Sequence, residues 1–280
     1  MDAVILLNKP AGMTSFDAVA KCRKIFHERK IGHTGTLDPE ASGLMIILLG
    51  KYTKLLPYCV KNHKAYQATL KLGEMTDTED IWGTIINTKT PSIHTEAEID
   101  NAVQSLTGDI LQVPPMYSAL KKDGKKLYEY ARQGIEIERK ARPVHISTLE
   151  VEKINETNYR MNAVVSSGTY IRTLITDFGK QLDELAIMSS LIRTKIEHLS
   201  LKDACTFEDL ESGVSFLSPM QVIDPTYKII ETDRVVDIKN GKRIKLDIRD
   251  PQVIFTSNGE LLAAYALQED GLYHCLRGLF

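Results

Sequence analysis

The fold of this chain is organised around the stretch Gly32-His33-Thr34-Gly35-Thr36-Leu37-Asp38-Pro39-Glu40-Ala41-Ser42-Gly43, which leads into a nearly unbroken apolar run, residues 44–49. A glycine-punctuated loop before a buried strand is where proteins present reactive side chains on backbone anchored to a rigid element. Asp38 precedes Pro39, which favours extended backbone at the aspartate and so fixes where its carboxylate lies. The stretch therefore marks Asp38 as a candidate reactive acid. A structural turn, in which the aspartate binds its own backbone, is the alternative.

Length and composition describe a globular protein. The 280 residues are 43% hydrophobic, which suits one or two domains with a substantial core. No apolar run reaches the roughly 20 residues of a membrane span and no basic-then-apolar leader opens the chain, so we expect a soluble, cytoplasmic protein. Four cysteines lie far apart without the spacing of metal ligands, and we interpret them as reduced packing residues: Cys22, Cys59, Cys205 and Cys275.

Charge is informative only locally. The net charge is −2, from 35 basic and 37 acidic residues, so the whole chain has no nucleic-acid signature. Residues 21–33 carry five basic side chains against one acidic, and residues 119–145 carry eight against four, so each segment nets +4. Such patches on a neutral protein suit contact with a phosphate backbone, and ordinary solvated faces are the alternative.

The N-terminal part predicts a strand and a helix. Residues 4–7 read as a short buried strand, and Thr14 with Asp17 has the pattern of a capping box that starts a helix. Lys9 lies in the turn between them, and we interpret it as a surface lysine, with a phosphate contact as the alternative. The expected buried stripe of the helix consists of its apolar positions, Phe16, Val19, Ala20 and Phe26.

The middle of the chain predicts a strand, an acidic loop and a second helix. Residues 66–72 alternate between apolar and polar as a strand does, and Tyr66 at its start is either a core tyrosine or a ring shown to a cleft. The acids at positions 77, 79 and 80 match no calcium loop, so we expect a solvated acidic loop. Thr95 and Glu98 predict a second capped helix, which ends at Gly108.

A third helix carries a cation in an unusual place. Strands are expected at about residues 144–151 and 159–165, and residues 166–169 then start the helix. Arg172 falls in its first turn, where the helix dipole favours acids over bases. The arginine therefore needs a partner, either in a surface ion pair or in a functional site.

The composition changes near Asp224 and Pro225. Beyond this point turn signals at positions 240–241, 258–259 and 270–271 separate short β-rich runs. This spacing predicts a small all-β barrel or hairpin module.

Several segments together resemble one known family. The opening stretch is similar to the GHTGxLDPxAxG motif of the bacterial tRNA pseudouridine-55 synthases, the TruB-type family. Blocks in the family order follow across most of the chain, which makes the resemblance highly specific. One position departs from the pattern, because Ser167 stands where family members often carry a lysine, so one phosphate contact is not expected here. The further blocks are residues 8–15, Lys64-Ala65-Tyr66, residues 72–78, residues 115–121, Gly168-Thr169-Tyr170-Ile171-Arg172-Thr173 and residues 186–194.

The resemblance implies an α+β fold, with a mixed, antiparallel sheet flanked by helices in residues 1–224 and a PUA-like RNA-binding β-barrel in residues 225–280. Residues 113–143 would form a mobile thumb that grips RNA. The implied enzyme isomerises uridine 55 in the T loop of tRNA to pseudouridine by base flipping and glycosidic bond cleavage, without a cofactor or metal. Its partner would be the T arm of tRNA, and we expect a monomer without an obligatory protein partner. A non-catalytic RNA-binding or RNA-folding protein and a sister synthase for another RNA are the alternatives.

The same resemblance assigns roles to single residues. Asp38 would be the catalytic aspartate, with Arg172 as its ion-pair partner. Tyr66 would stack its ring on the extruded base, which has lost its neighbours in the RNA. The other substrate contacts fall to three residues: Tyr170 beside the target nucleotide, Leu191 as the apolar wall of the base pocket, and His33 in the gap left by the flipped uridine.

Overall fold

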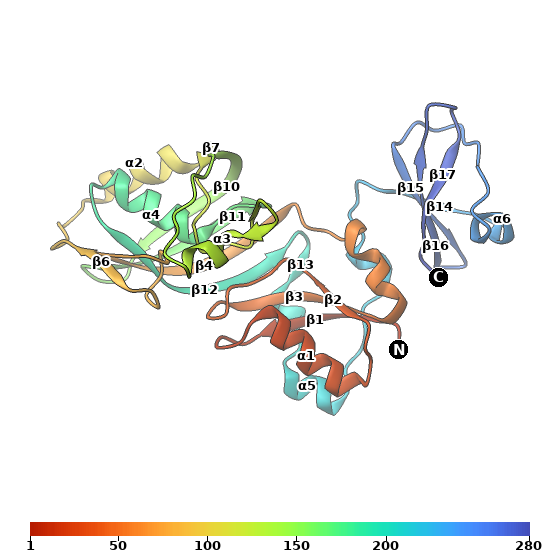
Figure 1. The fold of residues 1–280 in the computed structure, drawn as a ribbon, viewed down its shortest axis with the longest axis horizontal. Coiled ribbons are helices and arrows are strands. Elements are labelled where there is room, and N and C mark those ends of the chain that lie inside the picture. Colours follow the sequence, from red (N-terminus) through yellow and green to blue (C-terminus); the bar gives the residue numbers. More distant parts are fainter. The chain divides into compact units, whose positions relative to one another are not determined.

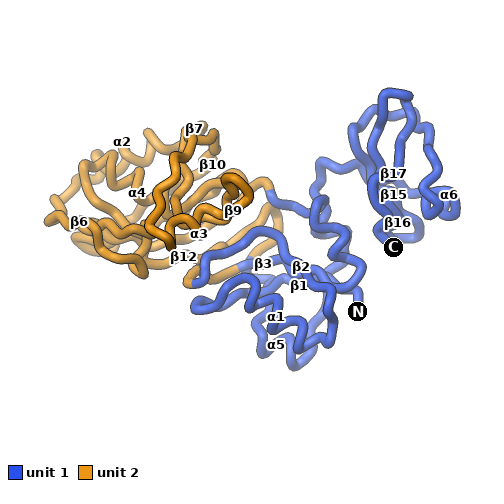
Figure 2. Tube along the Cα trace, in the orientation of Figure 1, with its two compact units in different colours: residues 1–39, 44–61, 201–280 blue, residues 40–43, 62–200 orange.

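The computed structural model describes all 280 residues. The chain divides into two compact units, drawn in two colours in Figure 2. Unit 1 consists of residues 1–39, 44–61 and 201–280, and unit 2 consists of residues 40–43 and 62–200. Residues 32–39 of the opening stretch, which include Asp38, thus belong to unit 1, whereas residues 40–43 belong to unit 2.

Unit 2 is built on one sheet. Its five long strands follow each other in the order β12-β4-β11-β10-β7, and every neighbouring pair is antiparallel. The strands are β4 (His63–Leu72), β7 (Gly108–Gln112), β10 (Arg142–Lys153), β11 (Asn158–Ser166) and β12 (Ala186–Ile196). Short strands complete the unit: β5 (Glu74–Thr76) with β6 (Ile85–Thr88), β8 (Lys121–Lys122) with β9 (Lys125–Lys126), and β13 (Leu199–Ser200) beside β12.

Two helices lie side by side on one face of this sheet, α2 (Glu96–Leu106) against β10 and α4 (Ile171–Gln181) against β12 (Figure 1). The predicted capping box of α2 is confirmed, because Thr95 and Glu98 exchange both of its hydrogen bonds. Helix α4 buries one apolar stripe. Its members Ile171, Leu174, Ile175 and Phe178 are buried, as is Leu182, which follows the helix as its C-cap residue.

The alternation predicted for residues 66–72 is confirmed by β4. The side chains of Ala68, Leu70 and Leu72 are buried, whereas Tyr66 at the start of the same face is only partly covered. The two strands predicted before α4 are also present, as β10 and β11.

Unit 1 contains the N-terminal elements. Strand β3 (Ser42–Leu49), whose first two residues belong to unit 2, lies between β1 (Ala3–Lys9) and β2 (Ile31–Thr34), and α1 (Ser15–Phe26) packs against β2. Residues 44–49 of β3 are fully buried, as expected from their unbroken apolar sequence. Short helices connect and cover these strands: η1 (Gly50–Tyr58), η2 (Leu201–Asp203), α5 (Phe207–Ser212) and η3 (Pro219–Val222).

The capping box predicted for α1 is confirmed, but its predicted apolar stripe is wrong at Phe16, which is 68% exposed. The buried stripe is shifted by one residue, to Ser15, Ala18, Val19 and Cys22. One residue corresponds to a rotation of about 100° around a helix, so Phe16 points away from the core. The buried stripe begins with a polar residue, Ser15, so a pattern of apolar positions does not reveal where it starts.

Residues 228–278 form a separate four-stranded sheet in the order β14-β15-β16-β17, with β14 parallel to β15. Asn258 and Gly259 both have positive φ, as a tight hairpin turn between β15 and β16 requires. The predicted barrel is not confirmed, because β14 and β17 do not pair to close the sheet. The elements are β14 (Lys228–Glu231), α6 (Val235–Lys239), β15 (Gln252–Ser257), β16 (Glu260–Leu267) and β17 (Tyr273–Gly278).

No helix in the structure is both long and apolar enough to cross a lipid bilayer. The four cysteines are free thiols. Cys22 and Cys59 are buried, and burial raises the pKa of each to about 12, as expected of packing residues. Cys275 is exposed, so the prediction that all four are packing residues is wrong for this one.

Candidate functional site

The loop that carries Asp38 is held by fixed contacts within unit 1. Just before the aspartate, the Ser15 hydroxyl accepts a hydrogen bond from the Leu37 amide (2.9 Å) and donates one to the Leu37 carbonyl (3.1 Å). Just after it, the Gly12 amide donates to the Pro39 carbonyl (3.1 Å). Asp38 itself is partly buried, so its backbone is fixed on both sides while part of the residue stays accessible.

Lys9 supports the same loop from inside the protein. It is fully buried, and its Nζ donates hydrogen bonds to the carbonyls of Pro10 (2.9 Å), Met13 (2.7 Å) and Pro39 (3.1 Å). The prediction of a surface lysine, and the alternative of a phosphate contact, are therefore both wrong. The turn wraps its carbonyls around the ammonium group, which a buried cation requires.

Replacing Lys9 by methionine is expected to lower the free energy of unfolding by about 2–4 kcal/mol, because three carbonyls lose a charged donor. Urea denaturation measures this change. The control is Lys24→Met on the exposed side of α1, with an expected change below about 0.5 kcal/mol. Equal losses in both variants would show that the buried ammonium group does not stabilise the loop.

The end of the opening stretch is fixed within unit 2. Ser42 and Gly43 pair in parallel with Ile192 and Arg193 of β12, which makes the sheet of this unit mixed. Gly43 has φ +111°, and a Cβ atom there would lie 2.4 Å from the Arg193 carbonyl oxygen. Only glycine allows this close approach, so Gly43 is required for packing.

Arg172 lies at the head of α4 and is buried, with only 6% of its side chain exposed. Its guanidinium donates to the carbonyls of Thr78 (Nη1, 2.8 Å) and Tyr117 (Nη2, 2.9 Å), and Nε lies 4.0 Å from the Asp80 carboxylate. A planar guanidinium is suited to bridge several acceptors in fixed directions. The exposed surface ion pair considered for this arginine is therefore wrong.

The acidic loop of residues 77–80 is also more than a solvated loop. Asp80 has 14% of its side chain exposed, close to Arg172. Glu79 accepts a hydrogen bond from the Thr173 hydroxyl (2.7 Å). Burial raises the pKa of Glu79, and the Thr173 hydrogen bond and the nearby Arg172 charge only partly offset this rise. The prediction of a solvated loop is therefore wrong for these two acids.

The raised pKa of Glu79 predicts a pH-dependent stability. The folded state holds this proton more tightly than the unfolded state, so the stabilisation is complete below the ordinary pKa of an unfolded glutamate and is lost as the pH rises through the raised pKa of the folded state. The difference in the free energy of unfolding between Glu79→Gln and the wild type should therefore increase from pH 4 to pH 7. Chemical denaturation across this range tests it, with the exposed Glu156→Gln as control. A flat difference for Glu79→Gln would contradict the prediction.

The sheet register brings two predicted pocket residues together. In the β12–β4 pair Leu191 lies opposite Ala68 and Arg193 lies opposite Tyr66, so Tyr66 and Leu191 are diagonal neighbours on one face. Leu191 is buried, and Tyr66 is partly exposed. An aromatic ring beside an apolar wall is suited to hold a flat base.

Tyr170 is the N-cap residue of α4 and is therefore close to Arg172 in the chain. Its main chain is bound by the buried side chain of Gln112. Beside this helix start, Lys64 Nζ donates to the Ser167 hydroxyl (3.3 Å). The ammonium group of Lys64 in β4 thus lies next to Ser167, the position at which the resembled family often has a lysine.

Residues 113–143, the predicted thumb, contain the β8–β9 hairpin and helix α3 (Leu127–Ala131). Two tyrosines of this segment have cations over their rings: Lys126 and Arg132 over Tyr128 at 5.3 Å, and Lys125 over Tyr130 at 4.7 Å. A hollow of about 250 Å³ in this segment is lined mostly by basic side chains. The segment therefore combines aromatic rings and cations as RNA-binding surfaces do.

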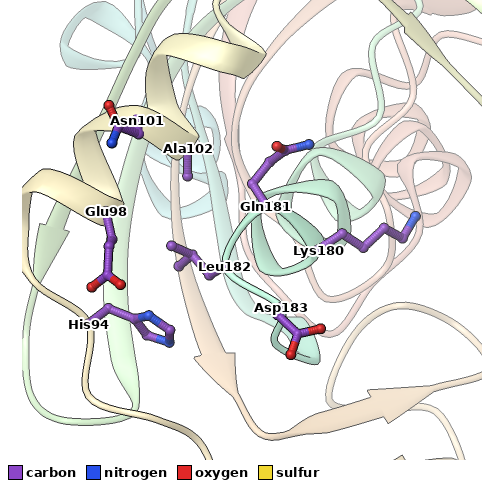
Figure 3. A pocket seen from close by; sticks show the side chains of 8 residues that line it. All are labelled: His94, Glu98, Asn101, Ala102, Lys180, Gln181, Leu182 and Asp183. Atoms are coloured by element: carbon purple, nitrogen blue, oxygen red, sulfur yellow. The ribbon is translucent and has the colours of Figure 1, made fainter.

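A different surface hollow, of about 430 Å³, lies between α2 and the C-terminal end of α4 (Figure 3). His94 and Glu98 lie on one side of it, and Leu182 and Asp183 on the other. It contains none of the predicted site residues, and Arg172 is at the opposite end of α4.

The structure thus places the predicted site residues in two groups. Asp38 and His33 belong to unit 1. The others belong to unit 2: Tyr66, Tyr170, Arg172 and Leu191. Sequence reasoning missed the supporting residues Gln112, Asp80 and Arg193. Arg193 is fully buried on the same face as Leu191, so the strand alternation contained a signal for it.

Comparisons with known proteins identify the family of this chain. Residues 23–171 match the family model described as TruB family pseudouridylate synthase (N terminal domain). The tRNA pseudouridine synthase B of Oceanobacillus iheyensis is 39% identical, over 95% of this chain and 92% of its own length. That of Geobacillus thermodenitrificans is 42% identical, over 95% and 94%.

Among solved structures, a chain of a Cbf5–Nop10–Gar1 complex has a TM-score of 0.71 at 23% identity, covering 99% of this chain and 85% of that one. It shows that the fold is shared. The family match covers more than half of the chain, and the identity to the bacterial relatives extends over nearly all of it. This chain therefore belongs to the TruB family of pseudouridylate synthases.

Proposed function

We propose that this protein converts uridine 55 in the T loop of tRNA into pseudouridine. The observation that carries the proposal is the Asp38 loop, whose backbone is fixed by Ser15, Gly12 and Lys9 while Asp38 stays partly accessible. A reactive carboxylate requires this combination of fixed position and access. The names of the bacterial relatives, tRNA pseudouridine synthase B, support a tRNA substrate.

In the proposed reaction the bond between N1 of uracil and C1′ of the ribose breaks, the base rotates, and C5 bonds to C1′. C5 loses its proton and N1 gains one, so the product is an isomer of the substrate. The ionised Asp38 attacks C1′, attacks C6 of the base, or removes the C2′ proton. Uridine deuterated at C2′ distinguishes the third step from the other two, because only the third gives a primary isotope effect.

We propose that Arg172 is the ion-pair partner of Asp38, since a neighbouring cation stabilises the charged form of a carboxylate. Tyr66 stacks on the extruded uracil, and Leu191 forms the apolar side of the same pocket. Tyr170 contacts the target nucleotide. His33 occupies the space that this nucleotide leaves in the T loop.

RNA binding is proposed for two further parts of the chain. The thumb, residues 113–143, grips the T arm through its cations and tyrosines. Residues 225–280 act as a PUA-like RNA-binding domain. Their sheet has its own buried core around Phe255, Tyr265 and Tyr273, which supports an independent domain with a boundary near residue 224.

The decisive experiment uses an unmodified T-arm transcript with tritium at C5 of its uridines. The wild-type protein, without added metal or cofactor, should release tritium from one uridine per transcript, because C5 exchanges its hydrogen for the bond to C1′. Mapping the product by sequence identifies position 55. Tight binding without release would favour an RNA-binding or RNA-folding protein, and release only from another RNA would favour a sister synthase.

A further inference from the structure

Gln112 is a buried glutamine that binds one residue twice. It is the last residue of β7 and is 1% exposed. Its Oε1 accepts a hydrogen bond from the Tyr170 amide (2.8 Å), and its Nε2 donates one to the Tyr170 carbonyl (3.1 Å). A glutamine side chain offers an acceptor and a donor at the same end, which matches the two main-chain groups of one residue.

Gln112 also lies at the base of the thumb. Gln112 is the residue before the thumb, and in the β10–β7 pair it lies opposite Arg142, where the thumb segment ends. Both ends of the thumb therefore meet at this glutamine. A second contact joins the thumb to the same helix start, because the Tyr117 carbonyl accepts a hydrogen bond from Arg172 Nη2 (2.9 Å).

Tyr170 needs the support that Gln112 gives. It is the N-cap residue of α4, and its own side chain makes no capping hydrogen bond. Serine, threonine, asparagine or aspartate usually fix the start of a helix through such a bond. The conformation at the head of α4, which presents Tyr170 and Arg172, is thus fixed in part from outside the helix.

We infer that Gln112 is a positioning residue for the reaction: it fixes the Tyr170 main chain and connects the base of the thumb to the helix start that carries Arg172. This inference rests on the proposed function for its effect on turnover. Gln112 acts through Tyr170 and Arg172. Loss of both bonds lets the helix start shift, and a displacement of about 1 Å at a reacting group can cost on the order of 10²-fold in rate.

The test uses Gln112→Met, which keeps the length of the side chain but removes both bonds, and Gln112→Glu, which keeps an acceptor for the Tyr170 amide but removes the donor. The matched control is Gln104→Met, because Gln104 is exposed on α2. Single-turnover pseudouridine formation at saturating T-arm transcript gives the rate, and filter binding gives Kd. Hydrogen exchange of the peptide covering residues 168–176 reports on the helix start without any substrate.

We expect Gln112→Met to lower the saturating rate by on the order of 10²-fold and to leave Kd within about threefold of the wild type. Gln112→Glu should lower the saturating rate by a smaller factor than Gln112→Met does. Amide exchange in residues 168–176 should become at least about tenfold faster in Gln112→Met and stay unchanged in Gln104→Met. A purely structural residue would instead lower the melting temperature and change rate and Kd together.

Three further results would also overturn the inference: unchanged exchange in residues 168–176, an unchanged saturating rate in a folded variant, or failure of both Gln112 variants to fold. The last would make Gln112 a residue of the fold alone. An inactive wild type would refute the proposed function instead, and the exchange experiment would still decide whether Gln112 fixes the helix start.

Discussion

Replacing Asp38 by asparagine is expected to lower the rate of pseudouridine formation by about 10⁴-fold or more, whereas Kd for the T-arm transcript stays within about threefold. The amide has nearly the shape of the carboxylate but cannot act as a nucleophile or as a base. The contacts that hold the loop come from Leu37 and Pro39 main-chain groups, so the substitution leaves them in place. Asp38→Ala should give the same result.

The measurement is tritium release under single-turnover conditions, with Kd determined in parallel by filter binding. The matched control is Glu40→Gln, which makes the same charge change two residues away in the same stretch and should keep nearly full activity. If Asp38→Asn still forms pseudouridine at a rate close to that of the control, Asp38 is not the reactive acid.

Replacing Arg172 by methionine is expected to lower the free energy of unfolding by about 3–5 kcal/mol, since removal of a buried charged partner leaves its acceptors unpaired. The affected groups are the carbonyls of Thr78 and Tyr117 and the carboxylate of Asp80. Arg172→Lys keeps the charge but cannot reach two carbonyls in the same fixed geometry, so it should show an intermediate loss. Both variants should also lose activity in the fraction that stays folded, because the proposed partner of Asp38 is gone or displaced.

Urea denaturation measures the loss, and Arg160→Met provides the comparison. Arg160 pairs with Glu152 at 3.1 Å, but 45% of its side chain is exposed, so its removal should cost less than about 1 kcal/mol. A loss for Arg172→Met no larger than that of Arg160→Met would show that the buried contacts do not stabilise the fold. A stable but inactive Arg172→Met would assign the arginine to the reaction alone.

The elements that sequence reasoning found correctly depend on signals between near neighbours. The capping boxes at Thr14 and Thr95 need only residues three apart. The alternation of β4 is equally local. The closure of a barrel depends instead on whether its first and last strands pair. In residues 228–278 the turn signals predicted the hairpins, but they carry no information on whether β14 pairs with β17.

The site divides in the same way. The sequence by itself determined the family, the candidate reactive acid Asp38 and the unusual cation Arg172, because each stands in a short motif. Only the tertiary structure showed that Lys9 is buried beneath the carbonyl of Pro39 and that Gln112 binds Tyr170. These contacts join residues 30 and 58 positions apart. Burial of a polar side chain is favourable only when its partners are brought to it, and the fold decides which partners those are.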